Sequence, residues 1–262
     1  MIQLKVHPSS DSNSLALQLK SNEKLSVSIE AAHLHLLKAF CDSISSMVSR
    51  IYELEVVISG SAESPINIDV GMSSVRFLNV TIERRPNLDL KIKADRIDIL
   101  GIFADTSVKL DLHIEARKLL HLTLKKCKTA LYGNCLEFKS LALLMGTSIS
   151  CTEKRVHARS VRFWTTSSKS LIRSIDHQSV KELNVFTSEQ RAKEALELTL
   201  ENLEHLSLSA LRVTNDVLCL SRYPAIKSME LCDVRIDIDT LNQIVDWNNI
   251  NLSMQFCRVE QG

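Results

Sequence analysis

Residues 97–124 of the chain read IDILGIFADTSVKLDLHIEARKLLHLTL, and this stretch holds the pattern that predicts the fold. A motif of the form apolar-x-x-apolar-x-apolar spans residues 97–102 and returns at residues 119–124. Between the two copies, residues 110–114 alternate apolar and polar side chains, as a half-buried β-strand does. One step of this chain therefore contains the motif and a second extended segment.

The same motif recurs along almost the whole 262-residue chain. The middle residues of ten copies are Leu54, Leu78, Leu100, Leu122, Leu141, Trp164, Leu183, Leu206, Met229 and Ile250. They cover 196 positions in nine steps, roughly 22 residues per step, which is a spacing typical of repeat proteins. This even spacing predicts a solenoid, in which each coil buries its apolar side chains only against its neighbours.

The expected fold class is a β-rich α/β repeat solenoid of about ten coils, built on one parallel sheet. Residues 88–92, 110–114 and 196–200 alternate apolar and polar side chains, so we expect mostly extended or irregular connecting halves. Only residues 239–247 carry apolar side chains at helical spacing in a connecting half. The solenoid proper is expected over residues 51–262.

Residues 1–50 have a different pattern, which predicts an N-terminal cap. Residues 2–6, 15–19 and 25–29 alternate as short strands, and one helical face then recurs over about residues 30–50. A solenoid needs such a cap because its first coil would otherwise expose its apolar interior.

The motif resembles the L-x-x-L-x-L strand signature of the leucine-rich repeat family, over roughly residues 51 to 256. In that family an Asn or Cys stands five residues after the middle Leu. The corresponding residues here are Ser59, Glu83, Asp105, Cys127, Gly146, Lys169, Ser188, Leu211, Val234 and Gln255. Only Cys127 and Asp105 fit, so the array resembles the irregular ones of F-box-associated substrate receptors. The resemblance implies protein recognition on the sheet face rather than catalysis.

The composition limits which cellular compartment and which class of binding partner we expect. The formal net charge is +1, so no global field favours nucleic acid or an anionic membrane. The seven cysteines include no CxxC pair, and neither a secretory signal nor a long apolar span is visible. We therefore expect reduced thiols in an intracellular protein, cytoplasmic or nuclear.

Strand alternation places a second set of side chains on the outer sheet face, opposite the motif's apolar residues. The residues that we predict to bind a partner protein there are Phe77, Ile99, Phe103, His121, Lys125, Phe163, Phe186 and His205. Exposed aromatic side chains among polar ones are typical of protein interfaces. A register shift of one residue would instead send some of these rings into the core.

The sequence leaves two other functions open besides a non-catalytic, partner-binding module. One is a parallel β-helix enzyme acting on carbohydrate, for which neighbouring coils would bring together acids such as Asp95, Asp98, Asp105 and Asp111. The other is a β-solenoid that assembles end to end, although a monomer is favoured outside a complex. No cofactor is expected, and His113 with His121 lacks the third ligand of a metal site.

Overall fold

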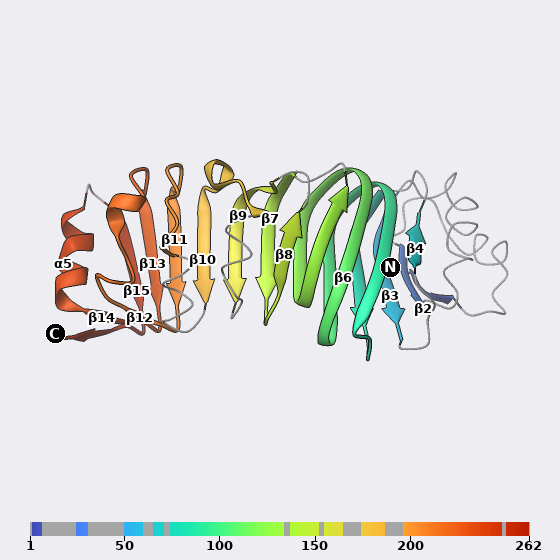
Figure 1. Ribbon diagram of the computed structural model, residues 1–262, viewed down its shortest axis with the longest axis horizontal. Helices are drawn as coiled ribbons and strands as arrows, with labels where there is room; N and C mark the ends of the chain where they lie inside the picture. The colour runs from blue at the N-terminus through green and yellow to red at the C-terminus, as the bar shows by residue number, and fades with distance from the viewer. Residues whose placement is uncertain are drawn as a thin grey trace. The chain divides into compact units, whose positions relative to one another are not determined.

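The computed structural model describes residues 2–6, 25–30, 50–59, 65–70, 74–133, 137–151, 155–164, 174–186, 196–247 and 250–261. The chain forms a parallel β-solenoid of about eight turns with little helix, where the sequence predicted about ten coils (Figure 1). It divides into two compact units, residues 1–137 and residues 138–262. The β-rich parallel solenoid predicted from the motif is confirmed.

The first unit is a parallel sheet with the strand order β1-β2-β3-β5-β6, and β4 pairs separately with β6. Its strands are β1 (Ile2–Val6), β2 (Leu25–Glu30), β3 (Arg50–Ile58), β4 (Ile66–Asp69), β5 (Ser74–Ile82) and β6 (Asn87–Gly133). Leu54, Leu78 and Leu100 lie side by side on β3, β5 and β6, and all three are fully buried. The middle residues of the motif therefore stack into one apolar column, as the repeat predicted.

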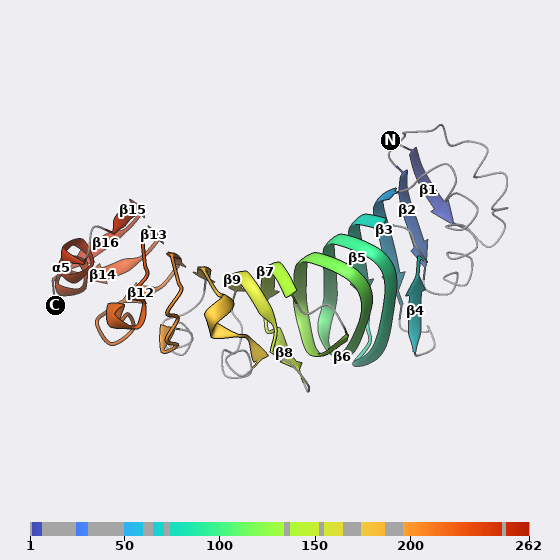
Figure 2. The same ribbon diagram turned by 90° about the horizontal axis from the view of Figure 1, so that it is seen from above.

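Strand β6 holds two copies of the motif in one uninterrupted extended segment, which winds through successive turns in Figure 2. Residues 88–92 and 110–114 belong to this strand, so the predicted extended connecting halves are confirmed there. The buried side chains of both segments alternate with half-buried or exposed ones. The backbone keeps a β conformation around the turn because every second side chain reaches the shared core.

Strands β1 and β2 join the same sheet as the motif strands. Leu4 lies opposite Val27, and Val27 lies opposite Leu54, all in parallel register. The strands predicted at residues 2–6 and 25–29 are thus confirmed. The strand predicted at residues 15–19 and the cap helix at about residues 30–50 lie outside the described residues, so the cap itself stays a prediction.

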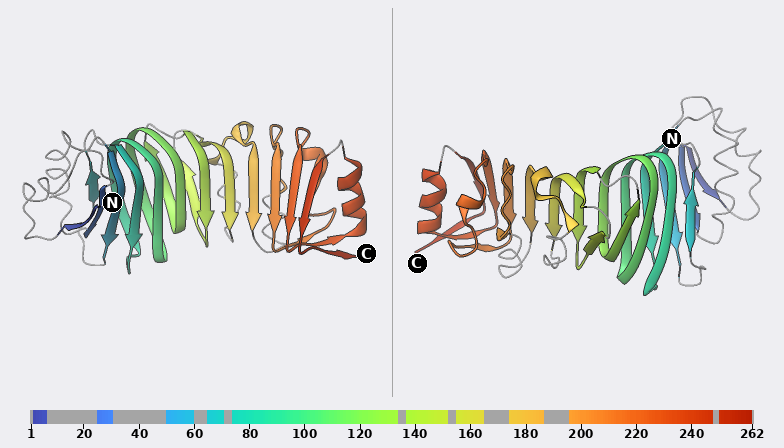
Figure 3. Two further views of the ribbon diagram at one scale, coloured as in Figure 1. Left: turned by 180° about the vertical axis from the view of Figure 1, so that it is seen from behind. Right: turned by 45° about the horizontal axis from the view of Figure 1, so that its top comes forward.

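The second unit carries two parallel sheets, with strand orders β7-β9-β10-β11-β13-β15 and β12-β14-β16. Its strands are β7 (Glu137–Leu144), β8 (Ser148–Cys151), β9 (His157–Trp164), β10 (Glu182–Phe186), β11 (His205–Ser209), β12 (Arg212–Val213), β13 (Ser228–Cys232), β14 (Arg235–Asp237), β15 (Asn251–Gln255) and β16 (Arg258–Glu260). The helices that lie wholly within the described residues of this unit are the 3-10 turns η2 (His177–Ser179) and η3 (Leu220–Arg222) and the α-helix α5 (Ile238–Asp246). The two sheets and α5 can be followed from behind in Figure 3.

Two copies of the motif were assigned in the wrong register in this unit. Val161, not Trp164, lies opposite Leu183, and Leu252, not Ile250, lies opposite Met229. The corrected motif around β9 uses Ala158 as its first apolar residue, and Ala158 is fully buried. This shift decides which aromatic side chains of β9 are available for binding.

The connecting halves of the second unit are shorter and less regular than those of the first. Residues 196–200, predicted as extended, form a turn and irregular chain, although Leu196 and Leu200 remain buried. The helix predicted at residues 239–247 is confirmed as α5. Its N-cap is Asp237, whose side chain accepts a hydrogen bond of 2.8 Å from the Thr240 amide.

Sharp corners follow most of the motif strands, and their residues adopt left-handed backbone angles. The non-glycine residues with φ between 47° and 58° are Arg84, Lys126, Met145, Ala210, Asp233 and Phe256. Five of the six stand four residues after the middle residue of their turn, in the corrected register. Such angles are uncommon for bulky residues, so these corners are imposed by the stacking of the turns.

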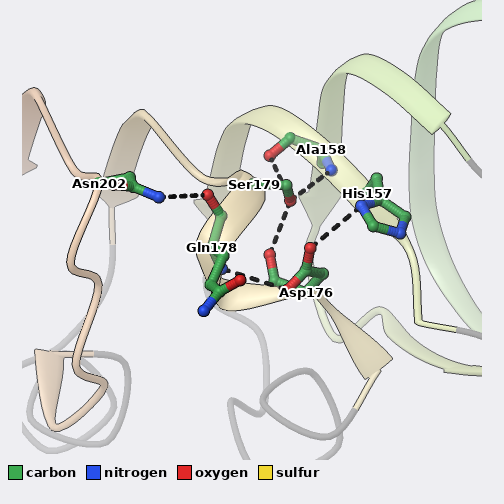
Figure 4. Close-up of polar contacts among 6 residues, drawn as sticks. All are labelled: His157, Ala158, Asp176, Gln178, Ser179 and Asn202. Atoms are coloured by element: carbon green, nitrogen blue, oxygen red, sulfur yellow. Dashed lines mark hydrogen bonds and ion pairs between the residues drawn. The ribbon is translucent and has the colours of Figure 1, made fainter.

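Polar side chains link successive turns at the start of the motif rather than five residues after its middle (Figure 4). The Ser179 hydroxyl accepts from the Ala158 amide at 3.0 Å and donates to the Asp176 carbonyl at 2.7 Å. One turn later, the Asn202 side-chain amide donates to the Gln178 carbonyl at 2.9 Å. The bonds to the Ala158 amide and the Gln178 carbonyl satisfy backbone groups of one turn with side chains of the next.

Cysteines occupy that later position in two turns. Cys127 is buried, and its thiol donates to the Lys125 carbonyl at 3.1 Å. Burial raises the pKa of the Cys127 thiol to about 12, so it stays protonated and inert at neutral pH. In the corrected register the last such position holds Cys257, whose thiol donates to the Leu231 carbonyl at 3.3 Å.

Candidate binding surface

The outer sheet face of the first unit carries a small aromatic cluster. Phe77 and Ile99 lie opposite each other on β5 and β6, and both are half-buried. The Phe77 ring meets the Tyr52 ring edge to face, with 5.4 Å between centroids. The Arg76 guanidinium lies 5.0 Å from the Tyr52 centroid and 5.2 Å from the Phe77 centroid. The cluster therefore combines aromatic packing with cation–π contact on a solvated face.

Phe103 extends this face over a glycine. A Cβ atom added at Gly101 would stand 2.5 Å from Cε2 and 2.8 Å from Cζ of the Phe103 ring. The ring thus lies against the Gly101 backbone and stays half-buried. A larger residue at position 101 would displace the Phe103 ring and the Asn79 side-chain oxygen, which would stand 2.9 Å from the added Cβ.

The second unit presents a more exposed aromatic pair. Trp164 and Phe186 lie opposite each other at the ends of β9 and β10, with exposed fractions of 39% and 40%. Their rings meet edge to face at 4.9 Å between centroids and 66° between planes. Phe186 was predicted on this face, and the structure places it there. Edge-to-face packing holds both rings in place while leaving apolar surface open to solvent.

The predicted position of Phe163 is wrong. Its side chain is 5% exposed and it lies opposite Val185, which is also buried. The corrected register of β9 turns Phe163 inward and its neighbour Trp164 outward, because consecutive strand residues face opposite sides. Trp164 is thus the surface residue that the sequence analysis missed.

The other predicted face residues are placed as expected, but they do not form one cluster. His121 and Lys125 are half-buried in the first unit. In the second unit His205 is exposed, and its Nδ1 lies 2.6 Å from the Ser228 hydroxyl oxygen on the next strand.

An ion-pair ladder stands at the start of the strands in the second unit. The Glu204 carboxylate lies 2.8 Å from Lys181 Nζ and 2.7 Å from Lys227 Nζ, on neighbouring turns. Hydrogen bonds from these two ammonium groups lower the pKa of Glu204 to about 2. The ladder holds the side chains of Lys181, Glu204 and Lys227, on three successive turns, in place near His205.

Three of the four acids considered for carbohydrate chemistry, Asp95, Asp98 and Asp105, are engaged in local contacts. Asp95 lies 3.4 Å from Arg117 Nε, and Asp98 lies 2.8 Å from Arg96 Nε. Asp105 accepts hydrogen bonds from the backbone amides of Arg84 and Thr106, and the Arg84 bond is the main cause of its lowered pKa. Asp105 thus caps the backbone at the left-handed corner formed by Arg84.

The described residues do not bring together three His, Cys, Asp or Glu side chains that could hold a metal ion. His113 stacks on the Tyr132 ring at 4.6 Å and lies 3.7 Å from an Asp89 carboxylate oxygen. These contacts give His113 a structural role within the first unit.

No family model, curated protein or solved structure matches this chain. Among the described residues, no helix has the length and apolar character needed to cross a membrane. Any statement of function therefore depends on the geometry of the surface alone.

Proposed function

We propose that this chain is a non-catalytic interaction module that binds a partner protein on the outer sheet face. The observation that carries the proposal is the Trp164–Phe186 pair, two large rings about two-fifths exposed and fixed edge to face. Aromatic residues of this kind supply much of the energy of protein interfaces because they bury a large area at a small entropic cost. Arg162 on β9 and Asn184 on β10 supply polar atoms beside them.

The rigidity of the sheet supports this function. Each face residue stands on a strand held on both sides by parallel neighbours, so binding costs little ordering of the surface. The half-buried cluster of Phe77, Tyr52 and Arg76 offers a second contact area of the same kind in the first unit. A rigid surface with a few aromatic anchors fits protein recognition better than turnover of a small substrate.

We also propose a more specific class for this module. The motif and the inter-turn bonds of Ser179 and Asn202 resemble a divergent leucine-rich repeat, and we propose an adaptor role in an intracellular complex. In that setting the array would select the partner, as the irregular arrays of F-box-associated receptors do.

The test is affinity capture of the partner from native cell extract, compared between the parent chain and the double variant Trp164→Ser/Phe186→Ser. We expect the variant to lose the partner by about tenfold or more, because the two rings are the central anchors. A matched control is Val245→Ser, since Val245 is 65% exposed but lies on α5 rather than on the sheet face. Equal capture by the double variant and the control would refute the proposed surface.

A further inference from the structure

Three arginines lie in register on the second sheet of the second unit. Arg212 on β12 lies opposite Arg235 on β14, and Arg235 lies opposite Arg258 on β16. All three side chains are exposed. Neighbouring strands are about 4.8 Å apart, so like charges directly opposite one another repel and cost stability. A row of three arginines is therefore a destabilising arrangement in the absence of a ligand.

The arginine row lines a groove, named here the corner groove, with a volume of about 530 Å³. Its lining residues are Ala210, Leu211, Arg212, Asp233, Val234, Arg235, Phe256 and Arg258. Ala210, Asp233 and Phe256 are the left-handed corner residues of three successive turns. Each corner turns the chain sharply into the second sheet, and three stacked corners make a concave surface. The volume falls within the range of sites that bind small groups or peptide side chains.

The charges of the corner groove are only partly balanced. Arg212 Nη2 lies 3.1 Å from a Glu260 carboxylate oxygen, and Asp233 places one further carboxylate on the wall. Within the part of the chain that the structure describes, no carboxylate lies within ion-pair distance of Arg235 or Arg258. Two neighbouring guanidinium groups are thus available to an anion.

Phe256 adds an apolar wall to the same groove. Its side chain is 85% exposed, and its φ of 55° is a rare conformation for an aromatic residue. An exposed ring beside two available guanidinium groups suits a ligand that has both an anionic and an apolar part.

We propose that the corner groove binds a phosphorylated side chain of a peptide segment, with the phosphate on Arg235 and Arg258 and a neighbouring apolar residue on Phe256. A phosphate offers three acceptor oxygens and can bridge two guanidinium groups on adjacent strands. A carboxylate has two oxygens and is matched by one guanidinium. The nearby Asp233 and Glu260 repel a long polyanion, so a single phosphate in a peptide fits the charges better than nucleic acid does. This site is separate from the outer sheet face, so the proposal of phosphate binding does not depend on the Trp164–Phe186 surface.

The experiment measures fluorescence anisotropy of the full chain with labelled degenerate peptide pools that carry a central phosphoserine, phosphothreonine or phosphotyrosine. The unphosphorylated pools, a single-stranded RNA oligonucleotide and inorganic phosphate are measured alongside. Arg235→Ala/Arg258→Ala tests the phosphate contact, and Arg235→Lys/Arg258→Lys keeps the charge without the forked geometry. Arg155→Ala is the matched control, because Arg155 is an exposed arginine outside the corner groove and outside the proposed binding surface. Far-UV circular dichroism checks that each variant is folded.

We expect a phosphorylated pool to bind at least about tenfold more tightly than its unphosphorylated form, since charge-assisted hydrogen bonds carry that much. The double Ala variant should lose this preference, the Lys variant should keep part of it, and Arg155→Ala should keep all of it. Inorganic phosphate should compete with the peptide only weakly because it makes no contact with Phe256. Equal binding of both pools, an unchanged preference in the double Ala variant, or tighter arginine-dependent binding of the RNA would each overturn the proposal.

Discussion

Truncation of two adjacent residues on β9 should lower the unfolding free energy by clearly different amounts. This comparison is the sharpest test of the corrected register. Phe163 is 5% exposed and packs opposite Val185, whereas Trp164 is 39% exposed and contacts Phe186. Phe163→Ala removes a buried ring and leaves a cavity, so we expect a loss of about 3–5 kcal/mol of unfolding free energy. Trp164→Ala removes one edge-to-face contact and a partly solvated ring, so we expect a loss of about 1–2 kcal/mol.

The assay is urea denaturation of the full chain followed by far-UV circular dichroism. Fluorescence is unsuitable because Trp164 is one of only two tryptophans and its removal would change the signal itself. The shift of the midpoint, multiplied by the slope of the transition, gives the change in unfolding free energy. A larger loss from Trp164→Ala than from Phe163→Ala would show that the two faces of β9 have been assigned the wrong way round.

Two further predictions concern the ion-pair ladder and the glycine under Phe103. The pKa of Glu204 falls from 4.5 to about 2 on folding, so its stabilising effect is complete above pH 4.5 and is lost as the pH falls toward 2. Glu204→Gln should therefore flatten the acid side of the stability–pH curve measured by thermal denaturation between pH 2 and 5, and an unchanged slope would contradict the ladder. Gly101→Ala should cost about 1–3 kcal/mol because its Cβ would overlap the Phe103 ring, which stands 2.5 Å away. The double variant Gly101→Ala/Phe103→Ala should recover most of that loss in chemical denaturation, and no recovery would show that the ring is not the obstacle.

The sequence predicted the core of the solenoid well where the motif was complete. Leu54, Leu78 and Leu100 stack as expected, and so do Leu183 and Leu206. In these turns three aliphatic residues at fixed spacing leave only one register that buries all of them. The pattern is then sufficient because burial and spacing agree.

The predicted register was wrong where a second apolar residue could also serve as the middle residue of the motif. On β9 both Val161 and Trp164 could serve as the middle residue, and the choice of Trp164 ignored Ala158 as a core residue. Strict periodicity would have resolved the choice. The observed middle residues at positions 161, 183, 206, 229 and 252 are 22, 23, 23 and 23 residues apart, more even than the spacings around Trp164 and Ile250.

The surfaces were harder to predict than the core. Trp164 and the corner groove depend on which side of a strand or corner a residue faces, and a one-residue shift reverses that. The arginine row is visible as a spacing of 23 between Arg212, Arg235 and Arg258, but its meaning needs the short strands β12, β14 and β16, and the second strands predicted from the sequence were placed elsewhere in the coil. Only the corner at Met145 includes a glycine, Gly146 with a φ of 75°, and none of the six corner residues is an asparagine, so residue type did not reveal most of these corners.

Those corners have a consequence for how this protein can change. Arg84, Lys126, Met145, Ala210, Asp233 and Phe256 each hold a conformation that glycine would adopt more easily. Substitution of glycine at these corners should therefore stabilise the array, because it removes the backbone strain and leaves the core residues unchanged. Phe256 is the exception under the proposed binding in the corner groove, because its corner places the ring on the groove wall.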